Sequence, residues 1–250
     1  MTTKINDKVR AVQCLLMSCV FSTSLYAADT PDFSGAWTTY RAPAADGVSA
    51  RTEAQLKLKP EALAAHADYQ GLIDGTDFSP GNACVGYGMP ASMLGSGGYP
   101  MEIIQRPEQL LVIYEAHNEL RRLYLGDEIR DPSKFFPERN GYSIARWEGE
   151  RLIVETSRLK TQVDTRYPHS DQASIREEYY LDPPLQDGSR VLVAELTMTD
   201  PAWLEEPFVT TKRWQEMSDY HVLSYECSEP KWLDEMTQLY DAAGLKMVQE

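Results

Sequence analysis

From residue 101 to residue 227, short runs of alternating apolar and polar residues follow one another, separated by Pro, Gly and charged positions. Alternation over roughly four to eight residues is typical of β-strands with one buried face. An opening run, Thr38-Thr39-Tyr40, which follows Trp37, adds a β-branched and aromatic segment near the start and predicts a first strand. Further strands are predicted at residues 101–105, 109–115, 119–125, 142–147, 152–157, 173–181, 190–199, 208–214 and 220–227. This series of about ten short strands indicates a sandwich or a barrel.

Charged residues interrupt two of the predicted hairpins. One hairpin covers residues 103–115 and leads into Arg121-Arg122, and the other covers residues 146–156 around a turn at Glu148-Gly149. Ionisable groups placed among apolar strand positions are how a closed barrel lines a pocket. We therefore predict an all-β, antiparallel barrel with a binding site inside it.

Two helices and one long loop are expected outside the strands. Residues 60–69 begin with a proline, which suits the first helical turn, and continue with strong helix formers. Residues 232–245 have an apolar side and predict an amphipathic helix that suits covering one end of the barrel. Residues 74–100 are rich in Gly, Pro and Ser, which is typical of a functional, lid-like or mobile loop.

The N-terminus predicts an export signal. Three basic residues within the first ten precede a short apolar run and a small-residue cleavage point at Ala27-Ala28. Residues 1–27 are therefore interpreted as a signal peptide, and residues 28–250 as a single domain. The alternative is a lipid anchor at Cys19. No apolar segment is long enough to span a bilayer, so we expect a periplasmic or secreted protein.

Charge and cysteine content narrow the partners. The formal net charge is −14, and loss of the predicted signal removes more basic than acidic residues. Such an acidic body repels phosphate, so nucleic acid and anionic membrane surfaces are not expected partners. Cys84 and Cys227 remain after the signal, and in an oxidising compartment this pair predicts a disulfide. The sequence predicts no particular oligomeric state.

Two adjacent arginines, Arg121 and Arg122, form the first candidate site. One of them is expected to point into the barrel, because neighbouring strand residues face opposite sides. A buried guanidinium needs a carboxylate partner or an anionic ligand. The two interpretations are a structural ion pair with Glu115 or Glu177, and a fork that grips a substrate carboxylate. Arg146, in the second hairpin, is a further candidate for substrate binding.

His117 lies between two carboxylates that are close along the chain. If the strand continued straight through, Glu115, His117, Glu119 and Arg121 would share one face, an arrangement that suits a metal ion. The alternative is that residues 116–118 form the hairpin turn itself, which breaks that alignment. We expect the turn, no metal site, and a role for His117 in binding a substrate.

His169 is the candidate general acid or base. It lies between Pro168 and Ser170 in a loop before a strand, where rigid folds often present functional groups. Asp171 or Glu177 is expected to orient the ring, and an unperturbed histidine titrates close to neutral pH. The alternative is a histidine that only bonds to a backbone carbonyl or caps a strand.

Two resemblances follow from short motifs. Gly35-Ala36-Trp37 on a first strand resembles the Gly-x-Trp opening of lipocalins, and this implies a barrel closed at one end by the Trp. Residues 31–229 are similar to a large family of exported bacterial proteins, which implies export but no particular activity. The motifs that carry the second resemblance are Pro31 to Trp37, Cys84, Tyr114-Glu115, His117, Arg121-Arg122, Arg146-Trp147-Glu148-Gly149, Pro168-His169-Ser170-Asp171 and Tyr225-Glu226-Cys227. Tyr142, Ala145 and Glu178 replace the family's usual His, Gly and Arg, so no role of those residues is transferred.

The first predicted function is a cofactor-independent lyase or isomerase that acts on a small aromatic or lipid-like acid. In this hypothesis His169 moves the proton, Arg121 or Arg122 holds the anionic group, and Tyr114 and Glu115 polarise the substrate. Phenolic acid decarboxylases offer a fold-level analogy, because their barrels also use Tyr, Arg and Glu. No phosphate loop or dinucleotide motif is present, so no organic cofactor is expected.

The second predicted function is an exported carrier that binds a small apolar ligand without changing it. The two hypotheses differ in what they require of the charged groups. A pocket whose charges are all paired internally favours the carrier, whereas unpaired His and Arg side chains that face one cavity favour the enzyme.

Overall fold

The structure is a computed structural model that describes residues 30–40, 56–76, 79–95, 97–126, 131–227, 234, 236–239 and 241–244. The predicted signal peptide, including Cys19, lies outside the described residues. So does part of the predicted C-terminal helix, whose described residues 236–239 are helical.

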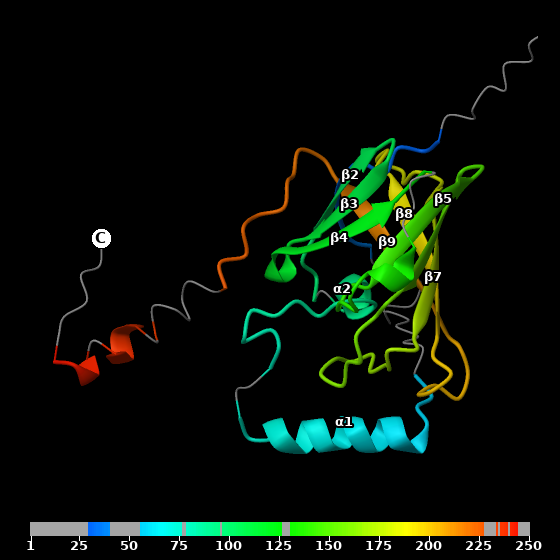
Figure 1. Cartoon of the computed structure of the whole chain (residues 1–250). Helices are drawn as coiled ribbons and strands as arrows, with labels where there is room; N and C mark the ends of the chain where they lie inside the picture. Colours follow the sequence, from blue (N-terminus) through cyan, green and yellow to red (C-terminus); the bar gives the residue numbers. More distant parts are fainter. Residues whose placement is uncertain are drawn as a thin grey trace, which may run out of the picture.

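Nine strands of the described chain form a closed barrel in which each strand neighbours the next one along the sequence (Figure 1). They are β1 (Gly35–Thr39), β2 (Met101–Arg106), β3 (Gln109–Tyr114), β4 (Glu119–Tyr124), β5 (Tyr142–Glu148), β6 (Arg151–Ser157), β7 (Ser174–Asp182), β8 (Val191–Thr199) and β9 (Phe208–Met217). β9 pairs with β1 and so closes the ring. The predicted barrel is confirmed, with strand ends within a few residues of those expected from the alternation.

β4 and β5 are the exception to the antiparallel order. They pair in parallel through Leu123–Ser143 and Tyr124–Ile144. The barrel is therefore mixed, and the prediction of a purely antiparallel sheet is wrong at this pair. When two consecutive strands are parallel, the connection between them must return the chain to the end of the barrel at which the first strand began. The connection lies between Tyr124 and Tyr142, and its described residues include the 3-10 turn η2 (Pro132–Lys134).

The strand predicted at residues 220–227 is also wrong. This segment, which we call the strap, has no regular secondary structure. Its backbone bonds to side chains instead of a neighbouring strand: Leu223 N donates to Glu115 (2.9 Å) and Tyr225 N donates to Asn118 (2.9 Å). The alternation of aromatic and polar residues in the strap therefore reflects side-chain contacts and not a β-ladder.

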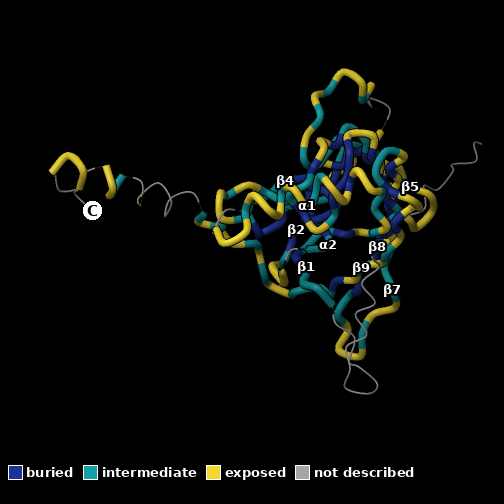
Figure 2. The backbone as a smooth tube through the Cα atoms, turned by 90° about the horizontal axis from the view of Figure 1, so that it is seen from below, coloured by how far each residue is buried: buried dark blue, intermediate teal, exposed yellow. Residues whose placement is uncertain are grey.

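Alternate strand residues fill the barrel interior, as the two-residue period of a strand requires. Trp37 on β1 is fully buried, and its indole N–H donates to the carbonyl of Phe33 (3.0 Å). Phe33 packs in turn against Trp147, with ring centroids 5.2 Å apart. Figure 2 shows buried residues along the strands of the barrel and exposed residues mainly on the loops around them. The Gly-x-Trp segment thus lies on the first strand and in the core, consistent with a lipocalin-like barrel at the coarse level.

The helix α1 (Pro60–Ile73) lies below the barrel in Figure 1. Its proline occupies the first turn, where a missing N–H costs nothing, and it runs further than the predicted residues 60–69. Ala62 is buried, and His66, Tyr69 and Ile73 are half-buried at the same three- to four-residue spacing. α1 therefore presents one narrow stripe to the rest of the protein.

The short helix α2 (Ala91–Leu94) arises from the long loop predicted at residues 74–100. Met89 and Met93, beside and within it, are fully buried in the core of the barrel. Gly88 allows the chain to pass into the core at this point. Its φ is +71°, and an added Cβ would lie 2.4 Å from the carbonyl oxygen of Arg139. Glu119 anchors the segment by accepting hydrogen bonds from Gly88 N (2.9 Å) and from the Ser92 hydroxyl. Part of the predicted loop is therefore a plug that fills one end of the barrel.

Candidate functional site

An ion pair lies inside the barrel. Arg121 on β4 and Glu177 on β7 are 1% and 0% exposed, and their guanidinium and carboxylate groups meet through two hydrogen bonds. Arg121 also donates to the hydroxyls of Ser143 (3.1 Å) and Thr156 (2.8 Å). Tyr179 donates to the Glu177 carboxylate at 2.8 Å. Each charge therefore has charged and polar partners supplied by neighbouring strands.

We call these residues the barrel cluster: Tyr114, Arg121, Ser143, Thr156, Glu177 and Tyr179. Burial alone would lower the pKa of Arg121, but the Glu177 carboxylate beside it outweighs burial and keeps the pKa above its ordinary value. Burial raises the pKa of Tyr114 and that of Tyr179, so both phenols are neutral at physiological pH. The sulfur of Met93 lies 3.3 Å from the Tyr179 hydroxyl, which places the α2 plug directly on the cluster.

The partner of the inward arginine is settled by this geometry. Of the two candidates, Glu177 pairs with Arg121 and Glu115 does not. Arg122 faces outward and is exposed, with its guanidinium 5.7 Å from the centre of the Tyr124 ring. The structural interpretation of Arg121 is therefore the one that the contacts support, and a role in binding a substrate stays a prediction.

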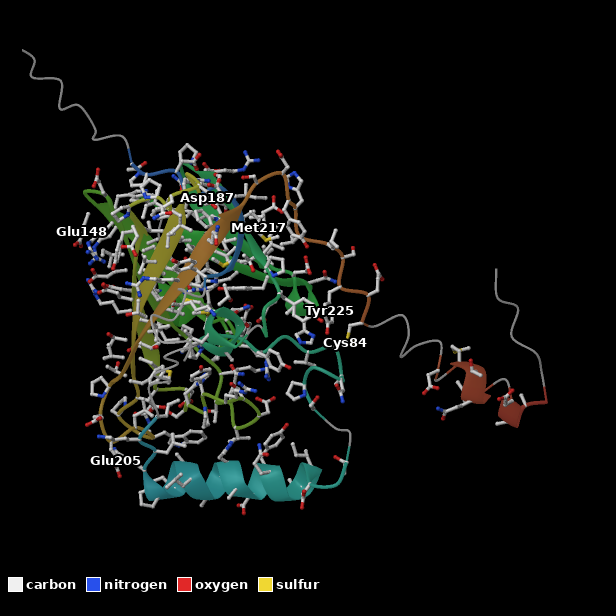
Figure 3. All side chains as sticks on the ribbon, turned by 180° about the vertical axis from the view of Figure 1, so that it is seen from behind. Cys84, Glu148, Asp187, Glu205, Met217 and Tyr225 are labelled. Carbon is white, nitrogen blue, oxygen red and sulfur yellow. A yellow bond between two sulfur atoms is a disulfide. The ribbon has the colours of Figure 1, made fainter. Side chains whose placement is uncertain are left out.

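Glu115 holds the strap to the barrel. Its carboxylate accepts hydrogen bonds from the Tyr220 hydroxyl (2.8 Å) and from Leu223 N (2.9 Å). The disulfide Cys84–Cys227, with Cα atoms 5.5 Å apart, fastens the end of the strap and confirms the predicted pairing. Figure 3 shows Cys84 and Tyr225 close together at the side of the barrel. Such a bond is typical of an oxidising compartment.

His117 lies in the turn η1 (Ala116–Asn118), as expected, so the straight-strand alignment with Glu115 and Glu119 does not form. Its backbone φ is +62°. Its ring packs against Tyr87 (5.0 Å between centroids) and Tyr225 (4.8 Å). Among the residues that the structure describes, no group of three His, Cys, Asp or Glu side chains is placed to hold a metal ion.

Arg146 lies on the outside of the barrel. It is half-exposed and pairs with Glu148 (2.8 Å) and Glu155 (3.0 Å). Arg121 therefore lies inside the barrel, whereas Arg122 and Arg146 lie on its outer face. The structure does not bring these three candidates together.

His169 is fully buried at an isolated bridge with Gln162. Its Nδ1 bonds to the carbonyl of Tyr167 at 2.8 Å, so the expectation that Asp171 or Glu177 orients the ring is wrong. Burial lowers the pKa of His169 more than the Tyr167 carbonyl and Asp200 raise it. Asp200 fixes the loop by accepting hydrogen bonds from Ser170 N (2.6 Å) and from the Ser170 hydroxyl (2.8 Å). A catalytic role for this neutral, buried imidazole stays a prediction.

A cleft of about 460 Å³ opens between α1, the 79–95 segment and the loop at residues 164–167. This volume lies within the range of small-molecule sites. Three tyrosines supply its aromatic walls: Tyr69 from α1, Tyr87 from the 79–95 segment and Tyr167 from the loop. His66 also lines the cleft, and its Nδ1 bonds to the carbonyl of Val163 at 2.8 Å, which attaches α1 to the loop. The inward stripe of α1 therefore forms a wall of the cleft.

The charges at the cleft are unequally partnered. The Asp164 carboxylate accepts two hydrogen bonds from Arg139 (3.1 and 3.0 Å), and Arg139 also donates to the carbonyl of Gly86 (2.7 Å). Partial burial and then Asp164 raise the pKa of Tyr69. Arg166 is exposed and lines the cleft, and within the described part of the chain it makes no hydrogen bond or ion pair. Within the described part of the chain, the cleft thus combines aromatic walls with a cation, Arg166, that has no ion-pair partner.

The sequence did not single out Tyr69, Tyr87, Tyr167 or Arg166 as site residues. One signal was present: Ala62, His66, Tyr69 and Ile73 mark a single stripe on α1. The other residues come together only through the fold, because the loop and the 79–95 segment are far apart in the sequence.

No helix in the described residues is both long and apolar enough to cross a membrane. A comparison with protein-family models gives no match, and a comparison with curated proteins gives none either. The functional argument therefore depends on the geometry of the barrel cluster and of the cleft.

Proposed function

We propose that the protein binds a small, flat molecule that carries one anionic group, in the cleft between α1 and the barrel. The observation that carries this proposal is Arg166, which lines the cleft with Tyr69, Tyr87 and Tyr167 and has no ion-pair partner among the described residues. Tyrosine rings supply apolar area for an aromatic or short apolar ligand, and a guanidinium matches a carboxylate with two parallel hydrogen bonds. This is the carrier hypothesis, with an anionic group added to the ligand.

The paired charges of the barrel support binding over catalysis. Arg121 and Glu177 satisfy each other, and Glu115 is engaged by the strap. A buried ion pair whose members already have hydrogen-bond partners has little left to offer a substrate. The lyase or isomerase hypothesis remains a prediction, and the same experiment tests it.

The test measures binding of 4-hydroxycinnamate, of its neutral amide and of hexanoate by isothermal titration calorimetry, with mass spectrometry of the recovered ligand. We expect the aromatic carboxylate to bind more tightly than the amide. Replacing Arg166 with Gln should abolish that preference, a loss of about ten-fold in affinity or about 1.4 kcal/mol. Arg146→Gln is the matched control, because Arg146 is an exposed arginine on the outer face of β5, away from the cleft lining.

Three outcomes contradict the proposal. The first is that none of the three compounds binds. The second is that Arg166→Gln and Arg146→Gln bind the carboxylate equally well. The third is that the ligand is recovered chemically changed, which would replace the carrier with an enzyme and would call for the same measurement on His169 variants.

A further inference from the structure

Two fully buried polar residues lie directly behind the cleft. Gln162 and His169 form an isolated antiparallel bridge in which each backbone N–H donates to the other's carbonyl, at 2.9 and 3.0 Å. They are 2% and 0% exposed. Residues that exchange both hydrogen bonds across an antiparallel pair lie opposite each other, with side chains on the same side. The bridge therefore holds the two side chains on one side of the paired backbone.

Each side chain holds the backbone of one tyrosine of the cleft. The amide of Gln162 donates from Nε2 to the carbonyl of Tyr87 at 2.8 Å. The imidazole of His169 bonds through Nδ1 to the carbonyl of Tyr167 at 2.8 Å. The contact from Gln162 spans 75 positions along the chain and connects the 79–95 segment to the loop. A continuous series of hydrogen bonds thus connects one tyrosine wall to the other.

The atoms in this series have defined roles. A carbonyl oxygen only accepts, so Nδ1 of His169 must carry the hydrogen, and in the neutral ring Nε2 is an acceptor. Nε2 of His169 and Oε1 of Gln162 have no partner among the described residues. Each residue therefore donates one hydrogen bond to a tyrosine carbonyl, and neither residue is among those that line the cleft.

We propose that Gln162 and His169 are positioning residues that set the separation of Tyr87 and Tyr167, and so the width of the cleft. This inference rests on the proposed function, because width matters only if the cleft receives a flat ligand. A fixed separation lets both rings contact such a ligand at once, without the cost of ordering the loop upon binding. Tyr167 lies only two residues from His169, whereas Tyr87 is far from the bridge in sequence and contacts it through Gln162.

Two substitutions of His169 separate positioning from catalysis. His169→Asn places an amide nitrogen near the position of Nδ1, so it keeps a donor for Tyr167 but has no counterpart of Nε2. His169→Leu removes both nitrogens. A positioning residue tolerates Asn and not Leu, whereas a general base acting through Nε2 tolerates neither.

The experiment labels the full chain with 3-fluorotyrosine and records ¹⁹F NMR spectra without ligand, with Tyr87→Phe and Tyr167→Phe to assign the two signals. Gln162→Met, a substitution of similar length without a donor, is expected to shift or broaden the Tyr87 signal. His169→Leu is expected to do the same to the Tyr167 signal, and His169→Asn to leave it near that of the wild type. ¹⁵N spectra of the histidines should show His169 with its hydrogen on Nδ1.

Binding of 4-hydroxycinnamate completes the test. Affinity should fall about ten-fold in Gln162→Met and His169→Leu and recover in His169→Asn, as expected for one lost positioning hydrogen bond. An unchanged Tyr87 signal in Gln162→Met, or a hydrogen on Nε2 in the wild type, would overturn the inference. If Gln162→Met does not fold, the ¹⁵N measurement on the wild type still decides. The ¹⁹F spectra need no ligand, so a failure of the proposed function remains distinguishable from a failure of this inference.

Discussion

Arg121 in the barrel and Arg166 in the cleft carry the same guanidinium group in opposite surroundings. Arg121 is enclosed by Glu177, two hydroxyls and the surrounding core. Arg166 is exposed and has no ion-pair partner among the described residues. A charge that is already satisfied contributes to folding, whereas a charge without a partner is available to a ligand.

The same contrast extends to the remaining polar groups of the two regions. In the barrel cluster the Glu177 carboxylate accepts hydrogen bonds from both Arg121 and Tyr179. Behind the cleft, Gln162 and His169 each retain an acceptor that no described residue satisfies. Substitutions in the barrel should therefore change stability and spare binding, and substitutions at the cleft should do the reverse. Arg121→Met tests that division directly, and three further predictions concern groups that link the two regions or lie behind the cleft.

The largest effect is expected from Arg121→Met. It leaves the Glu177 carboxylate buried without its cation, and breaking one side of a buried pair costs about 3–5 kcal/mol. Urea denaturation measures the loss in free energy of unfolding. The double variant Arg121→Met/Glu177→Met should recover much of it, because no unpaired charge remains. If the folded fraction of Arg121→Met has also lost its affinity for the cleft ligand, the proposed division between a stabilising barrel and a binding cleft is wrong.

Removing the disulfide should affect both properties. Cys84→Ser/Cys227→Ser opens a loop with a sequence separation of 143 residues, and such losses cost about 2–5 kcal/mol. Cys84 is close in sequence to Tyr87, so ligand affinity should fall as well. Reduction of the wild type with dithiothreitol is the control and should reproduce both changes. Loss of stability with unaltered affinity would show that the cleft is independent of the strap.

Gly88→Ala should disturb the plug between the two regions. Gly88 has φ of +71° and an added Cβ would meet the carbonyl oxygen of Arg139 at 2.4 Å, whereas Gly97 has φ of +69° and open space. Gly97→Ala should therefore cost only the strain of a left-handed residue, about 1 kcal/mol. We expect Gly88→Ala to cost about 2 kcal/mol more, because the crowded backbone must move. Equal effects in thermal denaturation would contradict the close approach.

The smallest effect is a dependence of stability on pH through His169. Burial lowers the pKa of His169 below its ordinary value of 6.5, so below that pH the unfolded chain binds a proton that the folded protein does not. Stability is therefore lost as the pH falls below 6.5, by at most about 1.4 kcal/mol per pH unit. His169→Asn should flatten this part of the profile. A wild-type profile that matches that of His169→Asn between pH 6.5 and pH 5 would indicate an unperturbed histidine.

The strands were predictable because alternation reports which residues face the core, and β7 shows it well. Ile175, Glu177 and Tyr179 are buried while Ser174 and Arg176 are exposed. Alternation does not report the direction of a neighbouring strand, so the parallel pairing of β4 and β5 was missed. It also does not distinguish a β-ladder from the strap, whose side-chain partners Glu115 and Asn118 are far away in the sequence.

The site was harder to predict than the fold. The inward orientation of one arginine and the pairing of Cys84 with Cys227 followed from alternation and from compartment, and both are confirmed. Which carboxylate meets Arg121 depends on strand order around the barrel, and the burial of His169 depends on packing that no local pattern encodes. The cleft joins three segments that are separate in the sequence, so Arg166 carried no signal of its own.

The disulfide has a topological consequence. The chain between Cys84 and Cys227 contains β2 to β9. Eight strands of the barrel therefore lie within the covalent loop that the disulfide closes, and β1 lies outside that loop. β1 joins the barrel through its ladders to β2 and β9. A single proteolytic nick at the exposed turn between β5 and β6 would therefore leave both fragments attached under non-reducing conditions.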